Sequence, residues 1–144
     1  MSVATTTRQL VVFSLGAEEY SLPITEVQEI IRFAEPRPVA SDATWIKGVI
    51  SLRGKIVPVC DLAARLGLDR DKAGDAKIVI VETQTGTVGV IVDSVEEVLT
   101  VDQAAVDPVP TAGTELIEAI VKIEERLIVL LSADEIFAGV SVAV

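Results

Sequence analysis

The stretch Gly48-Val-Ile-Ser-Leu-Arg-Gly-Lys-Ile-Val-Pro-Val-Cys-Asp-Leu62 decides the fold of this chain. Two runs rich in β-branched residues flank a polar tip, Arg53-Gly54-Lys55. β-branched residues favour strands, and a short glycine-containing tip between two such runs is typical of a β-hairpin. Asp61 ends the second run and is a credible N-cap, because its short side chain can accept from the first free amides of a helix. The stretch therefore predicts a hairpin that runs into a short helix.

This hairpin has a counterpart later in the chain, so the sequence contains an internal repeat. Two early segments align with segments 68 residues later, and the hairpin aligns with a segment 71 residues later. Ordered agreement across several separate segments favours a duplicated half-domain. The aligned pairs are Gln9–Phe13 with Lys77–Val81, Val27–Ile31 with Val95–Leu99, Gly48–Ile50 with Ala119–Val121, and Lys55–Val57 with Arg126–Ile128.

Each half is expected to contain the same elements in the same order. A strand (Gln9–Leu15 or Lys77–Thr83), a turn and a second strand come first. In the first half, Pro23 then fixes φ, which suits the first turn of a helix. The residues after Pro23 fit both helical spacing and strand alternation, and periodicity alone does not decide between them. We expect a short helical turn that opens into a third strand, followed by the hairpin and its helix.

Five short strands per half predict a mainly β fold, with two small five-stranded antiparallel barrels packed together and short helices. Pro58 cannot donate a ladder hydrogen bond, so its strand is expected at an edge or with a bulge. Ser132 is a second credible N-cap, and Gly67 can close the first helix in the left-handed conformation. Two such barrels would share an apolar interior and leave a groove between them, where binding sites are favoured.

The domain organisation follows from the repeat. We expect a single domain over residues 9–138, with halves 9–68 and 76–138 whose terminal strands are open to exchange between the barrels. Residues 69–75 are polar and form the expected linker, and residues 107–114 form a loop inside the second half. Residues 1–8 and 139–144 are expected to be flexible tails.

Composition limits the classes of function. Half of the 144 residues are hydrophobic and only 3% are aromatic, so the core must be aliphatic. The net charge of −10 argues against nucleic-acid binding, which needs clustered Lys and Arg. The apolar runs are far shorter than the ~20 residues of a membrane span. The N-terminus does not have the pattern of a secretory signal, and Cys60 has no second cysteine to pair with, so we expect a cytoplasmic protein.

Catalytic chemistry is difficult to build from these residues. The chain has no histidine and one cysteine, which leaves neither a Ser-His-Asp arrangement nor a zinc site. Cys60 sits in an aliphatic run and is expected to be a small buried residue. The acidic doublets Glu18-Glu19, Glu96-Glu97 and Glu124-Glu125 are interpreted as solvated charge, since sequence neighbours on a strand point to opposite faces. We therefore expect no enzyme activity, no metal and no cofactor.

Several segments together resemble the CheW family, the bacterial adaptors that couple chemotaxis receptors to the histidine kinase CheA. The resemblance covers roughly residues 9–137. It departs from the family at Ser51, where Asn is usual, at Ala119 and Glu125, where glycine is common, and at Ser132, where Asp is usual. The segments that carry it are Lys47–Leu62, Gln9–Gly16, Glu19–Ile24, Val27–Ile30, Val88–Asp93 and Arg126–Leu131.

The resemblance implies two barrels of the Src-homology-3 kind and a non-catalytic adaptor. It implies two partners, the regulatory domain of a CheA-type kinase and the cytoplasmic hairpin tip of a chemoreceptor. Carried over by position, the receptor-binding candidates are Val27, Glu29 and Arg53, with Gly48 shaping the hairpin. For Val27 a core role is an equal alternative, and the kinase-binding residues stay unassigned. The chain is expected to be a monomer alone and to be recruited to membrane-associated receptor arrays.

Two alternatives stay open from the sequence. The chain could be a CheW-like adaptor of a pilus or second-messenger pathway, or a regulatory module detached from a kinase or receiver fusion. A small enzyme with carboxylate-only chemistry is the alternative from another class. Genomic neighbours separate the pathways, and a turnover screen separates an enzyme from an adaptor.

Overall fold

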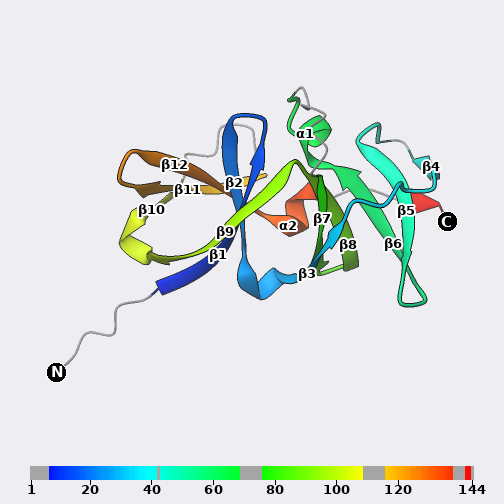
Figure 1. The fold of residues 1–144 in the computed structure, drawn as a ribbon, viewed down its shortest axis with the longest axis horizontal. Helices are drawn as coiled ribbons and strands as arrows, with labels where there is room; N and C mark the ends of the chain where they lie inside the picture. The colour runs from blue at the N-terminus through cyan, green and yellow to red at the C-terminus, as the bar shows by residue number, and fades with distance from the viewer. Residues whose placement is uncertain (1–6, 42, 69–75, 109–115, 138–141, 144) are drawn as a thin grey trace.

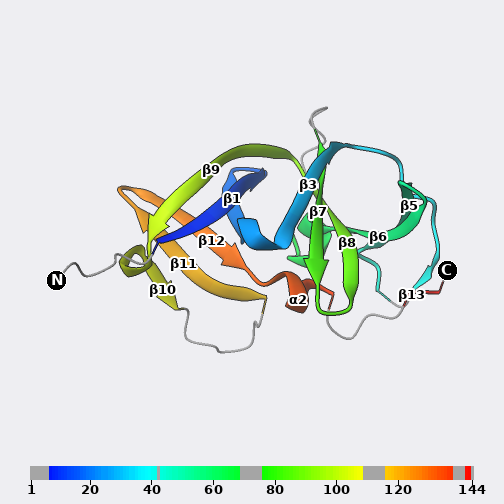
Figure 2. The ribbon, with the colours of Figure 1, turned by 90° about the horizontal axis from the view of Figure 1, so that it is seen from below.

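The computed structural model describes residues 7–41, 43–68, 76–108, 116–137 and 142–143. Its main strands form two sheets, which lie side by side as two lobes (Figures 1 and 2). Lobe A is the sheet of six strands: β10 (Val106–Pro108), β11 (Ile117–Ile123), β12 (Arg126–Leu131), β2 (Glu18–Pro23), β1 (Thr7–Leu15) and β9 (Ser94–Asp102), in spatial order. Lobe B is the sheet of five strands: β3 (Val27–Arg32), β7 (Lys77–Thr83), β8 (Gly86–Val92), β6 (Lys55–Asp61) and β5 (Ile46–Leu52).

Short elements connect these strands. The 3-10 turn η1 (Ile24–Glu26) leads into β3 as predicted, and η2 (Gln103–Ala105) leads into β10. Helix α1 (Leu62–Arg65) follows β6, α2 (Ala133–Ile136) follows β12, and β4 (Ala40–Ser41) pairs with β13 (Val142–Ala143). No helix in the described part of the chain is long and apolar enough to cross a membrane.

The repeat is visible element by element. β1, β2 and β3 correspond to β7, β8 and β9, and the β5–β6 hairpin with α1 corresponds to β11–β12 with α2. The sheets do not coincide with the halves 9–68 and 76–138, because each lobe contains the first hairpin of the other half. The chain crosses from lobe A to lobe B at η1 and back along β9, so the halves are interlocked (Figure 2).

The mainly β fold with short helices is confirmed, but two details of the barrels differ from the prediction. Lobe A has six strands, and neither lobe is purely antiparallel. β2 lies parallel to β12, and β8 lies parallel to β6. These parallel pairs arise where the exchanged hairpin of one half meets the last hairpin of the other.

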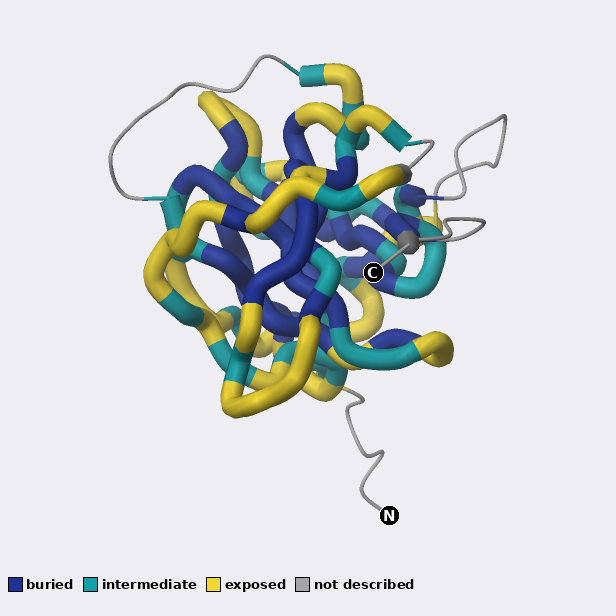
Figure 3. Tube along the Cα trace, turned by 90° about the vertical axis from the view of Figure 1, so that its right-hand side faces the viewer, coloured by how far each residue is buried: buried dark blue, intermediate teal, exposed yellow. Residues whose placement is uncertain are grey.

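Three aliphatic clusters hold the fold together. Lobe A encloses a cluster with Leu10 and Val12, and lobe B encloses one with Ile78 and Ile80. The third and largest cluster, the interlobe core, takes side chains such as Phe13 from both sheets. Strands β1 and β7 are buried on both faces, which explains their uninterrupted apolar sequences. Figure 3 shows the buried chain at the centre and the exposed residues at the hairpin turns.

The interlobe contact also has a polar element. Arg65 of α1 donates from Nε to the carbonyl oxygen of Ile136 at the end of α2, 3.1 Å away. Its guanidinium lies 4.7 Å from the ring centre of Trp45, which itself packs edge-on against Phe137. The Nη2 of Arg65 also donates to the carbonyl oxygen of Glu135, 3.4 Å away. Because the last carbonyls of a helix have no intrahelical donor, Arg65 satisfies two of them from the neighbouring lobe.

Both predicted N-caps are confirmed, since the side chain of Asp61 accepts from the amide of Ala64 and that of Ser132 from the amide of Glu135. Gly67 has a φ of 75°, as its predicted role after α1 requires. Of the two alternatives predicted for Pro58, the edge position is wrong, because β6 lies inside the sheet between β8 and β5. Proline is tolerated there because the ladder to β8 begins one residue later, at Val59. The alternative of a bulge fits better, since the pairing of β5 with β6 shifts register between Ile46 and Gly48, opposite Cys60 and Val59.

The predicted boundaries differ at the ends. β1 begins at Thr7, and the pairing of β13 with β4 lies inside the segment expected to be a C-terminal tail. Residues 107–108 end β10, and the rest of the predicted loop lies outside the described residues, as does the predicted linker 69–75.

Candidate functional site

The β5–β6 hairpin tip brings Arg53 and Glu29 together. Arg53 has a φ of 50° and Gly54 a φ of 80°, so the tip is a tight turn with both residues in the left-handed region. From this turn the guanidinium reaches β3, where Nη2 donates to Oε1 of Glu29 over 2.9 Å and Nη1 donates to Oε2. The tip of one edge hairpin is therefore tied to the strand at the other edge of the sheet of lobe B.

This ion pair is charged and open to solvent. The Arg53 side chain is 73% exposed and that of Glu29 is 26% exposed. The hydrogen bond from Arg53 lowers the pKa of Glu29, and the same bond raises the pKa of Arg53. Since Arg53 has five N–H donors and Glu29 engages two nitrogens, donors remain for an incoming acceptor. The arrangement fits recognition of a carboxylate or carbonyl oxygen.

Val27 is the first residue of β3, directly after η1. Its side chain is half-buried and packs against the interlobe core. A packing role is thus established for Val27, and a role in binding stays a prediction.

Gly48, in strand β5 of the hairpin, allows a close approach of the Arg37 backbone. Its φ is 144°, and a Cβ at this position would lie 1.9 Å from the carbonyl oxygen of Arg37. That segment is held there by two hydrogen bonds, from Arg37 N to Val49 O (2.8 Å) and from Val49 N to Arg37 O (2.9 Å). Only glycine permits this close approach, so Gly48 shapes the outer side of β5. Its part in receptor binding stays a prediction.

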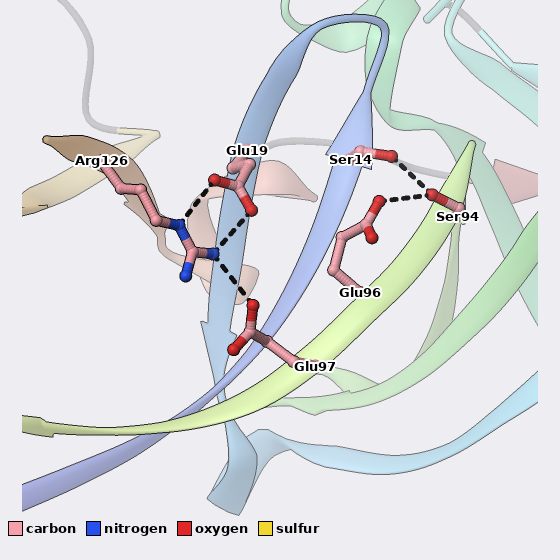
Figure 4. Close-up of polar contacts among 6 residues, drawn as sticks. All are labelled: Ser14, Glu19, Ser94, Glu96, Glu97 and Arg126. Carbon is pink, nitrogen blue, oxygen red and sulfur yellow. Dashed lines mark hydrogen bonds and ion pairs between the residues drawn. The ribbon is translucent and has the colours of Figure 1, made fainter. Parts of the chain in front are cut away.

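The corresponding end of lobe A is closed differently (Figure 4). Arg126 of β12 donates from Nε and Nη2 to the carboxylate of Glu19 on β2, at 3.1 and 2.8 Å, and from Nη2 to Glu97 on β9 at 3.0 Å. These hydrogen bonds raise the pKa of Arg126. Nearby, Ser14 and Ser94 share a hydrogen bond of 2.6 Å, which ties β1 to β9. We call the three residues Arg126, Glu19 and Glu97 the lobe A clasp.

The clasp adds a partner to one interpretation made from the sequence. Glu19 and Glu97 belong to acidic doublets that the sequence predicts to be solvated charge; both side chains stay partly exposed, and both accept from the same arginine. The signal was available in the repeat, because Glu97 aligns with Glu29 at a spacing of 68 residues. It could not be used, since nothing in the sequence shows that β2 and β9 close the same lobe.

The described residues contain no group of three or more His, Cys, Asp or Glu side chains that could hold a metal ion. Cys60 is fully buried, and this burial raises the pKa of its thiol, so it is a packing residue at neutral pH. Among the hollows of the surface, one of about 410 Å³ lies between β6 and β8. It is lined by Ile56, Pro58, Thr85, Gly86, Thr87, Val88 and Phe137, so its wall is part apolar and part polar. The groove expected between the barrels stays a prediction.

Comparison with known proteins identifies the family. Residues 9–141 match the family described as CheW-like domain. A probable chemotaxis protein CheW of Rhizobium etli is 31% identical over 136 residues, with 91% of this chain and 88% of that protein aligned. The chemotaxis protein CheW of Bacillus subtilis is 34% identical over 136 residues, with 91% and 87% aligned.

A solved structure agrees with this result. The crystal structure of the scaffolding protein TtCheW from Thermoanaerobacter tengcongensis superposes with a TM-score of 0.86 at 35% identity, and the match covers 92% of this chain and 94% of that one. The two-lobed arrangement described above is therefore the fold of that scaffold, with its two Src-homology-3-like subdomains. The chain belongs to the CheW-like domain family of chemotaxis scaffold proteins, which couple receptors to the kinase CheA and do not themselves catalyse a reaction.

Proposed function

We propose that this chain binds the cytoplasmic hairpin tip of a chemoreceptor at the Arg53–Glu29 pair, and the regulatory domain of a CheA-type kinase elsewhere on its surface. The observation that carries the receptor assignment is the exposure of an arginine fork that is already oriented by a carboxylate. An oriented fork loses little conformational freedom when a partner's oxygen binds, which favours recognition.

The roles of the four candidate residues differ in this proposal. Arg53 contacts the receptor directly, and Glu29 positions its guanidinium. Gly48 allows the hairpin to lie where Arg53 can reach β3. Val27 begins the strand that carries Glu29, and its packing against the interlobe core fixes that strand.

The kinase contact is expected to use apolar strand surface, because two similar β domains can pack strand against strand and bury aliphatic side chains. Such a contact depends weakly on salt, whereas the contact at Arg53 weakens as salt screens it. The two interfaces can therefore be distinguished by titrating salt.

The experiment measures the affinity of the pure chain for two probes separately, a soluble receptor cytoplasmic fragment and the isolated kinase regulatory domain of the same organism. Arg53→Ala should weaken receptor binding about tenfold or more, since charge-assisted hydrogen bonds are lost. It should leave kinase binding unchanged. Receptor binding by Arg53→Ala that equals the wild type would remove the receptor assignment.

The alternative, an adaptor of a pilus or second-messenger pathway, is less well supported. A match to the protein PilI of Pseudomonas aeruginosa covers 58% of this chain, whereas chemotaxis proteins named CheW align over about 90%. Testing kinases from each pathway of the source organism in the same binding assay separates the two. Exclusive binding to a non-chemotaxis kinase would favour the alternative.

A further inference from the structure

The two lobes differ at one place where the repeat makes them directly comparable, the parallel strand pair. In lobe A, β12 and β2 pair from Ile128 with Glu19 to Leu130 with Ser21. At the repeat spacings, the first of these pairs corresponds to Val57 with Thr87 in lobe B. The ladder of lobe B instead runs from Val59 with Gly89 to Asp61 with Ile91. The ladder between β6 and β8 therefore begins two residues later along both strands than the ladder between β12 and β2. The start of β6, next to the hairpin tip, and the start of β8 are not paired with each other.

Pro58 accounts for this displacement. It corresponds to Val129 of lobe A, which has a backbone N–H, whereas proline has none. A second difference acts in the same direction. Arg126 and Glu19, which fasten β12 to β2 in the lobe A clasp, correspond to Lys55 and Thr87, which cannot form an ion pair. At this end of the strand pair, lobe B therefore lacks both the backbone N–H donor of Val129 and the Arg126–Glu19 ion pair of lobe A.

The hollow of about 410 Å³ lies at this opening. Val88 and Phe137, which are 6% and 8% exposed, line it and belong to the interlobe core, so part of its wall is apolar. Ile56 of β6 lies on its rim and is 53% exposed. An exposed large aliphatic side chain beside an apolar hollow is the kind of surface that a partner covers.

The position of the hollow indicates which partner. Ile56 lies three residues from Arg53 on the same hairpin, so the hollow adjoins the proposed receptor site. The exposed Lys55 adds a cation at the tip, beside the Arg53–Glu29 pair, and Glu82 accepts a hydrogen bond from Thr87 in the wall of the hollow. We propose that the hollow receives a bulky aliphatic side chain of the receptor segment that binds at Arg53, and that this side chain lies next to an acidic residue of that segment. This inference rests on the proposed function and adds an apolar half to the site.

Two substitutions test the hollow without touching Arg53. Ile56→Ala removes the exposed rim and should weaken binding of the soluble receptor fragment about tenfold, as expected for an interface hot spot. Pro58→Val restores the donor that lobe A has at Val129, lengthens the ladder and narrows the opening, so it should weaken binding while preserving thermal stability. Leu127→Ala is the matched control, because Leu127 occupies the position of Ile56 in lobe A and is 61% exposed. It should bind like the wild type.

A measurement on the wild-type chain guards against misfolded variants. Methyl NMR during titration with the receptor fragment should shift the methyl signals of Ile56 and Val88, and leave that of Leu127 in place. The inference is overturned if neither methyl signal shifts, or if both lobe B variants bind like the wild type, or if Leu127→Ala weakens binding equally. In each of these cases a loss of binding by Arg53→Ala leaves the proposed function standing, whereas normal binding by Arg53→Ala removes the proposed function itself.

Discussion

Glu29 and Glu97 occupy the same position in the two halves of the repeat, and each accepts hydrogen bonds from an arginine in a β-hairpin of its own lobe. The arginines differ in their surroundings. Arg126 is shared between two carboxylates and its side chain is 35% exposed, whereas Arg53 binds Glu29 and is 73% exposed. An arginine–glutamate ion pair thus links strands in lobe A, whereas in lobe B it leaves the guanidinium of Arg53 exposed.

Arg126→Ala should destabilise the fold more than Arg53→Ala does. The substitution removes three charge-assisted hydrogen bonds and leaves Glu19 and Glu97 close together, so we expect a loss of about 1 kcal/mol, as for a small surface network. Receptor affinity should not change. Urea denaturation at low and high salt checks this, and equal stability of variant and wild type at low salt would contradict a fastening role.

Gly48→Ala should be strongly destabilising. The added methyl group meets the Arg37 carbonyl, and alanine resists a φ of 144°, so a loss of at least about 3 kcal/mol is expected. This corresponds to a fall in melting temperature of roughly 10 °C for a chain of this size. Gly16→Ala is the control, since its φ is 60° and a Cβ there meets no atom within 4 Å. It should lose only about 1–2 kcal/mol. Similar losses for both variants would show that steric contact at Gly48 is unimportant.

Glu26 should make stability depend on pH. Its Oε2 is buried without a hydrogen-bond partner, and burial, with Asp134 and Glu118 nearby, raises its pKa above the ordinary 4.5 despite Arg8. The folded state therefore holds this proton more tightly than the unfolded state. The resulting contribution to stability is fully present below pH 4.5 and is lost as the pH rises through the folded-state pKa.

Glu26→Gln removes this dependence. The variant should gain stability over the wild type as the pH rises from 4.5, by less than ~1 kcal/mol because the side chain is only half-buried. Thermal denaturation between pH 4.5 and 8 measures the difference. Glu29→Gln is the control of opposite sign and is measured below pH 4.5, because the lowered pKa of Glu29 means that its contribution is lost as the pH falls through the folded-state pKa. A stability difference for Glu26→Gln that stays constant with pH would contradict the titration of this group.

The sequence predicted the local structure well where a residue has a distinctive backbone preference. Asp61 and Ser132 cap helices, and Gly67 adopts the left-handed region. The aliphatic repeat predicted the strands, because alternation and β-branching are properties of each segment alone.

The sequence did not predict which strands meet. A duplicated half-domain permits each half to close on itself or to exchange its first hairpin, and both arrangements bury the same apolar residues. The parallel pairs, the interior position of Pro58 and the lobe A clasp all depend on that exchange. Arg53 could be identified as a candidate from the family resemblance, but its partner Glu29 became evident as a partner only in the folded chain.

The central claim is that this chain transmits a receptor's state to a kinase through the Arg53 site. The most direct measurement is ATP turnover by the purified CheA-type kinase of the same organism, reconstituted with membrane-bound receptor and this chain. The wild type and Arg126→Ala should make turnover dependent on the receptor and sensitive to its ligand, and Arg53→Ala should leave turnover at the level of the kinase alone. Receptor-dependent turnover with Arg53→Ala equal to the wild type, or receptor control of the kinase without this chain, would contradict the account.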